Sequence, residues 1–420
     1  MYNYYKIALA DFAVVIWIFA LARLLLRKIP SLADALVFIT LYYNAQIPVF
    51  NILNTDFIDT FAITEYAKNS SNSAGQLLVI LVSIAALYTG YYLTNTKKFA
   101  HSIRINNNKA LKLFVLFVCI VLFLIYCVFS LQREGFFNSY EDPDPYALPS
   151  GTVVLFLTFI KVFGILLSLF ALMNLVKRSM LINLFLITAV FFLVFIASYS
   201  GKRLEVLMSV STVFVIYYVE KIKPLLRLII VVVALFGLMS IGVSRMGGEL
   251  SSKNVAVLPL LEGFFSNHSF VGYYELLDKN KISYEYGIKF AQSIGAFVPR
   301  FLLPNKEELL YANYGMLTKE VAPLGGNSLL ADLYLQGGLP SCILFYLFLG
   351  FFFKKIQLNN YDLKQIYQKK SVSLKIPIYI ITLTIFITHM RDGMVTAIKT
   401  YLQVIVVLYI FYLFLKKWNY

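Results

Sequence analysis

Long apolar stretches separated by short polar segments follow one another through almost the whole chain. Most are close to the roughly twenty residues that an α-helix needs to cross about 30 Å of hydrocarbon. Because unpaired backbone groups are costly in lipid, stretches of this length predict helices and not the short alternating strands of a membrane barrel. We count eleven candidate spans, at residues 7–26, 32–53, 76–94, 111–131, 152–176, 180–199, 204–219, 225–243, 328–353, 375–390 and 393–415.

The basic residues fall on every second connection between these spans, and the acids fall on the others. Short cytoplasmic loops of membrane proteins are enriched in Lys and Arg, so this alternation places the N-terminus outside and the C-terminus in the cytoplasm. The second span contains Asn44, Gln46 and Pro48, where a helix can tilt, break or re-enter. The inner connections hold Arg23, Arg27, Lys28, Lys97, Lys98, Arg104, Lys109, Lys112, Lys177, Arg178, Lys221, Lys223, Arg227, Lys354, Lys355, Lys364, Lys369, Lys370, Lys375, Lys416 and Lys417. The outer connections hold Asp56, Asp59, Glu65, Glu134, Glu141, Asp142 and Asp144.

Composition agrees with an all-α, polytopic membrane bundle forming a single domain over residues 1–420. Hydrophobic residues make up 60% of the chain and charged residues only 14%. The net charge of +15 does not argue for a nucleic-acid partner, because topology and anionic lipid headgroups account for the inner basic residues. Residues 1–6 lack the features of a cleaved signal peptide, so we expect the first span to remain. Cys119, Cys127 and Cys342 fall inside predicted helices, where they are expected to pack as small apolar residues.

Residues 244–327 form the one long stretch too polar for hydrocarbon, and the alternation makes it a large extracytoplasmic loop. Its residues 255–274 are rich in aromatic side chains and suit the membrane interface. Pro299 fixes the backbone just before Arg300, and residues 324–328 offer N-cap chemistry for the ninth span. We therefore expect this loop to form a lid or wall over a cavity.

Cations gather on the outer face, where topology does not require them. A guanidinium can clamp phosphate through two parallel hydrogen bonds, so several together would suit a lipid-linked diphosphate. Each of them taken singly is as well explained by anchoring to lipid headgroups. Lys399 can snorkel outward from its span, whereas Lys161 lies deeper, where ionisable residues usually face protein or water. The outer cations are Arg133, Lys202, Arg203, Arg245, Arg300 and Arg391.

A transfer reaction that expels such a diphosphate would also need a base, and the outer face offers histidines and carboxylates. A histidine titrates near neutrality, which favours His268, although a solvated loop residue is the simpler interpretation. His389 can orient Arg391, and Gln336-Gly337-Gly338 with Pro340 predicts a break in the ninth helix. The candidates for the base are His268, Glu249, Glu262, Glu275, Asp332, His389 and Asp392.

An Asp-x-Asp pattern at Asp142 and Asp144 is the one candidate metal motif. Flanking prolines make it typical of a rigid acidic turn, and a divalent cation would need further oxygen ligands that the sequence does not supply. We therefore expect neither a metal nor another cofactor.

Four stretches in order resemble the Wzy-type O-antigen and capsular polysaccharide polymerases, over residues 190 to the C-terminus. They are Ser-Gly-Lys-Arg at 200–203, Val-Pro-Arg-Phe-Leu-Leu-Pro-Asn-Lys at 298–306, Gly-Gly-Asn-Ser-Leu-Leu-Ala-Asp-Leu-Tyr-Leu-Gln-Gly-Gly at 325–338 and His-Met-Arg-Asp-Gly at 389–393. This chain departs from the family's pattern at Gly337-Gly338-Leu339-Pro340, because a further glycine often follows there in the family.

The resemblance implies a fold similar to the GT-C glycosyltransferases and a metal-independent polymerase of undecaprenyl-diphosphate-linked repeat units in a bacterial inner membrane. The growing glycan would leave its lipid diphosphate for a sugar hydroxyl of the next lipid-linked unit, making lipopolysaccharide O-antigen or capsule. Expected partners are this donor and acceptor and membrane lipids, with room for a chain-length regulator. The residues implied at the diphosphate are Lys202, Arg203, Arg245, Arg300 and Arg391, and the candidates for catalysis are His268 and Asp392.

Two other classes of protein stay open. A lipid-linked oligosaccharide flippase or secondary transporter shares the composition but favours ionisable groups at the bilayer midplane and repeated halves. An O-antigen ligase would share the chemistry and differ in its acceptor.

Overall fold

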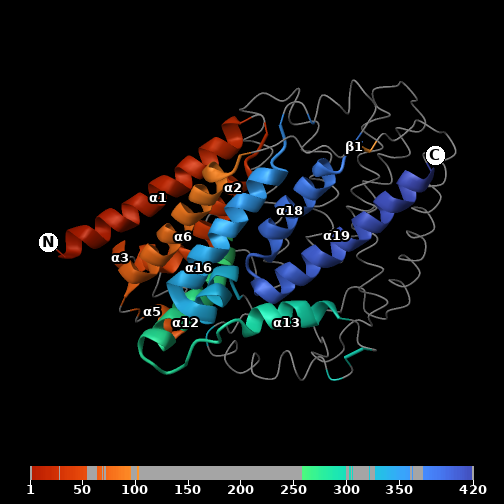
Figure 1. The fold of residues 1–420 in the computed structure, drawn as a ribbon. Helices are drawn as coiled ribbons and strands as arrows, with labels where there is room; N and C mark the ends of the chain where they lie inside the picture. The colour runs from red at the N-terminus through yellow and green to blue at the C-terminus, as the bar shows by residue number, and fades with distance from the viewer. Residues whose placement is uncertain are drawn as a thin grey trace.

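The chain is described by a computed structural model in which the described residues are mostly α-helical (Figure 1). The helices are α1 (Tyr2–Leu26), α2 (Leu32–Asn44), α3 (Gln46–Leu53), α5 (Glu65–Lys68), α6 (Ser73–Leu93), α12 (Leu258–Asp278), α13 (Ile288–Phe297), α16 (Leu329–Ile356), α18 (Lys375–His389) and α19 (Gly393–Trp418). Two short strands, β1 (Ser102–Ile103) and β2 (Val372–Ser373), pair antiparallel. The structure describes residues 2–27, 29–53, 64–68, 70, 72–95, 102–103, 258–298, 302–303, 305, 321, 327–359, 362 and 372–418.

Six of the eleven predicted spans fall on described residues, and all six are helical. Among the described residues, four helices are long and apolar enough to cross a membrane, at Tyr4–Leu26, Ser73–Leu93, Leu329–Ile356 and Gly393–Ile410. The bent pair α2 and α3 brings the number to five if it is one span, and α18 is a shorter apolar helix. Several apolar helices thus support a membrane protein. The five spans predicted between residues 111 and 243 lie outside the described residues, so the total of eleven and the GT-C-like fold stay predictions.

Both predicted interruptions of the helices are confirmed. The second span bends by 56° where α2 ends at Asn44 and α3 begins at Gln46. In α16 the backbone leaves helical geometry at Gly337 and Gly338. Gly338 has φ 65° and ψ −147°, a conformation that is nearly exclusive to glycine. These breaks expose backbone groups and small residues where polar side chains from other helices can reach them.

The bundle has two opposite ends, and successive spans run from one end to the other. At one end, which we call the basic end, the turn after α1 contacts the end of α16 and the start of α18, because Gln357 and Tyr379 donate to the carbonyl of Pro30. At the other end, which we call the site end, the end of α2 meets the starts of α6 and α16 and the corner between α18 and α19 (Figure 1). This arrangement agrees with the alternation read from the charges. Which end faces the cytoplasm stays a prediction. The basic end carries Arg23, Arg27, Lys354, Lys355 and Lys375.

Helices α6 and α16 cross closely through two glycines. A side chain at Gly90 would collide with the carbonyl of Leu347, and one at Gly350 would collide with the carbonyl of Leu87. Small residues that let backbones approach are the usual means of packing helices in lipid, where no hydrophobic force drives association. The crossing fixes α16, and therefore its N-terminal site end, against α6.

Helix α12 contradicts the prediction that residues 255–274 lie in the membrane interface. Its aromatic side chains are covered by α2, α3 and α16, and Phe264, Phe270 and Tyr273 are at most 1% exposed. His268 is likewise 1% exposed, so it is not the solvated loop residue considered from sequence. Between Gly263 and Leu277 the helix buries polar side chains as well as aromatic ones. An interfacial helix would instead keep a polar face toward water. Both α12 and α13 lie within the predicted loop at 244–327.

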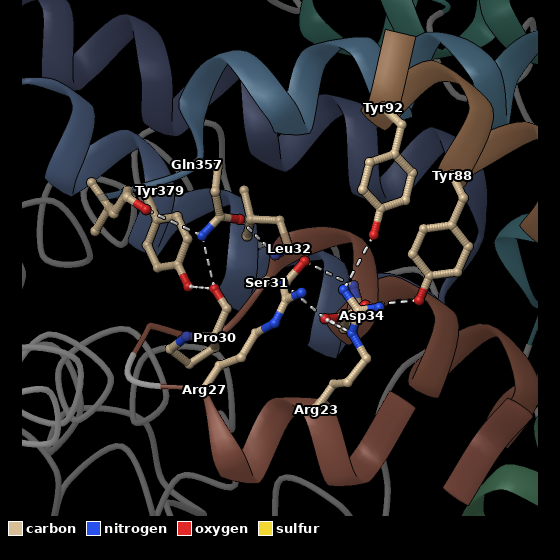
Figure 2. A network of polar contacts seen from close by, with 11 residues as sticks. Arg23, Arg27, Pro30, Ser31, Leu32, Asp34, Tyr88, Tyr92, Gln357 and Tyr379 are labelled. Atoms are coloured by element: carbon tan, nitrogen blue, oxygen red, sulfur yellow. Dashed lines mark hydrogen bonds and ion pairs between the residues drawn. The ribbon is translucent and has the colours of Figure 1, made fainter. Parts of the chain in front are cut away.

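A network around Asp34 holds the basic end together (Figure 2). Asp34 is completely buried at the start of α2, and one of its oxygens lies 3.1 Å from Nε of Arg23 and 3.4 Å from Nη1 of Arg27. The hydroxyl of Tyr88, from α6, donates to the other oxygen at 2.7 Å. The buried carboxylate is thus shared between α1 and α6, which is how a lone charge at a membrane-helix end avoids an unpaired state.

The first prediction concerns this carboxylate. Asp34→Ala should lower the free energy of unfolding by about 2 kcal/mol, because Arg23 and Tyr88 lose a charged acceptor. Thermal unfolding in detergent micelles measures the change. Asp11→Ala removes an exposed acid from α1 and is the matched control. Equal melting temperatures for the two variants would show that the network does not stabilise the bundle.

Candidate functional site

Two of the four stretches that carry the family resemblance meet at the site end of the bundle. Asn327 forms a parallel bridge with Asp392, although they lie far apart in sequence. The backbone N–H of Leu329 donates to the carbonyl of Met390 at 2.7 Å, so the start of α16 lies directly on the corner between α18 and α19. The stretches at 325–338 and 389–393 therefore form one local structure, which we call the Asn327–Ser328 joint.

Ser328 ties two further helices into this joint. Its hydroxyl accepts from the N–H of Ala331 at 3.0 Å, which confirms the predicted N-cap, and donates to the side-chain oxygen of Asn44 at 2.6 Å. Its own backbone N–H donates to the hydroxyl of Ser269 at 2.9 Å. One completely buried serine thus joins α2, α12 and α16.

Asp332 is the buried carboxyl of the joint. It has no exposed surface, and its oxygens accept from the side-chain amide of Asn327 at 2.6 Å and from the backbone N–H of Met394 at 2.6 Å. Burial disfavours the charged form of this carboxyl, and the charge of Lys289, itself 2% exposed on α13, favours it. Both oxygens are occupied by donors from the protein, so this candidate base is placed to hold α16, α13 and α19 together.

Helix α13 is fastened to the break in α16 by hydrogen bonds. The side-chain oxygen of Gln336 accepts from the backbone N–H of Lys289 at 3.0 Å, and its amide donates to Glu285 at 2.9 Å. The backbone N–H of Glu285 donates to the carbonyl of Leu335 at 3.0 Å. The side chain of Gln336, directly before Gly337, thus anchors α13 across the site end beside the start of α19 (Figure 1).

His389, Arg391 and Asp392 form a connected group at the corner between α18 and α19. Nδ1 of His389 lies 2.7 Å from one oxygen of Asp392, and Nε of Arg391 donates to the other at 3.3 Å. Burial alone would raise the pKa of the Asp392 carboxyl, but the hydrogen bond with His389 and the charges of Arg391 and His389 lower it below its usual value. Asp392 is therefore ionised at neutral pH, and its oxygen accepts a hydrogen bond from the Nδ1–H of His389.

The second ring nitrogen of His389, Nε2, is buried. When the ring is neutral and Nδ1 carries the proton, Nε2 holds the lone pair. No hydrogen-bond partner for this buried nitrogen is found within the described part of the chain. The arrangement of a carboxylate, an oriented imidazole and a lone pair is that of a general base.

His268 occupies a different environment on α12. Its Nδ1 lies 3.1 Å from the carbonyl of Phe264, and its ring packs against Phe264 and Phe265 with centroids 5.3 and 6.3 Å away. Burial lowers the pKa of His268, against the raising effect of hydrogen bonds to the backbone of these two residues. The ring is neutral and covered, although the neighbouring Ser269 contacts the Asn327–Ser328 joint.

Of the other predicted residues, the structure describes Glu275, Lys399 and Glu262, the last on α12 with its side chain outside the described part. Glu275 is completely buried, pairs with Lys279 at 3.0 Å and accepts from Ser70 at 3.1 Å, so it links α12 to the segment before α6. Lys399 lies on α19, two turns after Arg391. Lys202, Arg203, Arg245 and Arg300 lie outside the described residues, as do Arg133, Lys161, Asp142, Asp144 and Glu249.

Sequence reasoning missed two of the residues that organise the site. In the sequence, Lys289 looks like an ordinary surface lysine. Only the helix break after Gln336 indicates that a neighbouring segment must supply hydrogen-bond partners for the interrupted backbone. Asn44 was noted as an interruption of a span, but its contact with Ser328, far away in sequence, has no local signal. A polar residue inside a predicted span is the signal that could have pointed to Asn44, whereas Lys289 lies in the predicted loop and has no such signal.

The second prediction tests the buried pair of Asp332 and Lys289. Asp332→Asn should lower the free energy of unfolding by about 3 kcal/mol, because it leaves Lys289 buried without its counter-charge. Adding Lys289→Met should restore at least about 1 kcal/mol. Lys281→Met, at an exposed lysine on the same segment, should restore nothing. Additive effects of Asp332→Asn and Lys289→Met in thermal unfolding would show that the two side chains do not interact.

Comparison with known proteins adds no further relationship. No protein-family model, no curated protein and no solved structure matches the chain. The candidate site is therefore defined by the contacts that join α2, α12, α13, α16, α18 and α19.

Proposed function

We propose that the chain is a membrane glycosyltransferase that polymerises polyprenyl-diphosphate-linked oligosaccharide units at the extracytoplasmic face. The observation that carries the proposal is the direct contact between the stretches at 325–338 and 389–393 at the site end. They place Arg391, Asp392 and His389 on one corner, at the end of the bundle opposite Arg23 and its basic neighbours. Positive-inside orientation then puts this corner at the outer leaflet.

Arg391 is suited to hold the diphosphate. Its side chain is 31% exposed, so it is accessible without being fully solvated. Its contact with Asp392 through Nε fixes the plane of the guanidinium, and a planar fork matches the oxygens of a phosphate. A fixed cation in a partly dry site stabilises the charge that builds on a departing diphosphate.

The packing of α13 supports a place for Arg300 in the same site. Ala296 and Val395 form a small apolar cluster, which lays the end of α13 on the start of α19. Arg300 comes four residues after Ala296, and Arg391 comes four residues before Val395. Chain length alone therefore keeps Arg300 within about 14 Å of this cluster. Lys202, Arg203 and Arg245 join the site in this proposal through the family resemblance.

His389 is the base that the geometry favours. The acceptor sugar hydroxyl attacks the anomeric carbon, the bond from that carbon to the diphosphate oxygen breaks, and the diphosphate leaves with the electron pair. The hydroxyl proton passes to Nε2 of His389, while ionised Asp392 stabilises the imidazolium through Nδ1. His268 ranks second as a candidate base, because Phe264 and Phe265 enclose its ring and restrict access to it.

The third prediction is a loss of polymerisation when Arg391 is changed. In proteoliposomes with a synthetic polyprenyl-diphosphate oligosaccharide, Arg391→Ala should lower the rate by about 100-fold or more. Arg391→Lys should restore little, because an ammonium lacks the bidentate fork. Lys355→Ala, at an exposed cation of the basic end, is the matched control and should keep normal chain lengths.

The products of this assay separate the classes of function. Long glycans from wild-type protein support the polymerase, and transfer of single units to a different acceptor would indicate a ligase. Movement of the lipid-linked unit between leaflets without a new glycosidic bond would indicate a flippase. Wild-type chain lengths from Arg391→Ala would remove Arg391 from the site.

The fourth prediction distinguishes the two histidines. His389→Ala should reduce kcat by about 100-fold or more with little change in KM, because a base acts in the transition state. Asp392→Asn should lose activity too, since an amide can stabilise the wrong tautomer. His268→Leu keeps the apolar packing of α12 and should retain most activity. The reverse order, with His268→Leu inactive and His389→Ala active, would transfer the base to α12.

A further inference from the structure

Helix α13 has the reverse of the polarity expected for a helix facing water. Lys289 and Ser293 point into the protein and are 2% and 1% exposed. Ile288 and Ile294 point outward and are 52% and 65% exposed. A surface helix of a soluble protein turns its apolar side inward, so the medium outside α13 must itself be apolar.

The outward face contains no charged residue over the whole helix. It is formed by Ile288, Phe290, Ala291 and Ile294, whereas the inward positions 289, 293 and 296 follow helical spacing. Burying a lysine is costly, and here the charge of Asp332 offsets that cost. The one charged residue of α13 therefore points into the protein and not toward the surrounding medium.

The outward face of α13 continues onto the lipid-facing side of a candidate span. The ring of Phe290 contacts the ring of Phe345 on α16, with centroids 6.0 Å apart. Beside Phe345, Leu344 and Phe348 are 67% and 61% exposed on the same helix. Exposed apolar side chains on a span face acyl chains, so the apolar surface runs without a break from hydrocarbon onto α13.

We propose that α13 lies in the plane of the membrane as an interfacial helix, with Ile288, Phe290 and Ile294 inserted among the lipids of the extracytoplasmic leaflet. The partner is the boundary between headgroups and acyl chains. Helix α13 lies at the site end, beside the start of α19 (Figure 1). Tyr286, 80% exposed just before α13, suits the headgroup level where tyrosines gather.

This position is independent of the reaction, but it has a consequence for substrate access. Val298, the C-cap of α13, is the first residue of the stretch that contains Arg300. A helix at the headgroup level lies at the depth of the phosphates of a polyprenyl diphosphate. The substrate would then enter beside α13 from the bilayer and not from water.

Spin labels measure the surroundings of α13 directly. A chain lacking reactive thiols (Cys119→Ser, Cys127→Ser, Cys342→Ala) receives one new cysteine at Ile294→Cys or Ala291→Cys, carries a nitroxide and is reconstituted into phosphatidylcholine and phosphatidylglycerol vesicles. Leu344→Cys on α16 is the lipid reference, and Ser283→Cys, exposed in the segment before α13, is the water reference. Collisions with oxygen report lipid, and collisions with a soluble nickel chelate report water.

Labels at Ile294 and Ala291 should show a ratio of oxygen to nickel collisions at least about threefold above that at Ser283 and close to that at Leu344. A ratio equal to that at Ser283 would place the face in water and overturn the proposal. Low collision rates with both reagents would mean that a second copy of the chain covers the face, which also overturns it. Lipid exposure in a chain without polymerase activity would refute only the proposed function.

Discussion

The requirement that buried polar groups find partners inside the protein governs the site end. Buried donors and acceptors in a membrane bundle have no water to bind. Each interruption of a helix must therefore be satisfied by hydrogen-bonding groups from other segments. Ser328 illustrates this, since its hydroxyl and backbone N–H contact Asn44 and Ser269 on two other helices. Because those partners are distant in sequence, satisfying them determines how α2, α12 and α16 meet. The joint is thus both a consequence of desolvation and the reason that the motifs converge.

The two ends of the bundle solve the same problem with different chemistry. At the basic end, Asp34 is surrounded by two arginines and a tyrosine, which neutralise it and close the turn between α1 and α2 (Figure 2). At the site end, Asp332 is held mainly by an amide and a backbone N–H, with a single buried cation nearby. The two buried carboxyls thus differ in their partners, which are two guanidinium groups and a hydroxyl for Asp34 and mainly neutral donors for Asp332.

The sequence predicted the elements well and their contacts poorly. Spans depend on length and hydropathy, and breaks depend on local residues such as Gln46 and Gly338, so both could be read in one dimension. The position of α12 could not, because aromatic density suits a membrane interface and a buried helix equally. The inward direction of the Lys289 side chain could not be predicted either, because it depends on Gln336, which fastens the backbone of α13, and on the charge of Asp332. For the site, Arg391 and Asp392 were predicted from their motif, whereas the orientation of His389 required the geometry.

Two carboxylates at one joint show how the same residue type serves structure and chemistry. Asp332 is completely buried, and each of its oxygens receives a donor from the backbone or from Asn327. The side chain of Asp392 is 33% exposed, and its partners are an imidazole and a guanidinium. A general base needs a group whose protonation can change during the reaction, and an imidazole is such a group. In the proposed reaction the first carboxyl therefore fixes the corner, and the second orients the base.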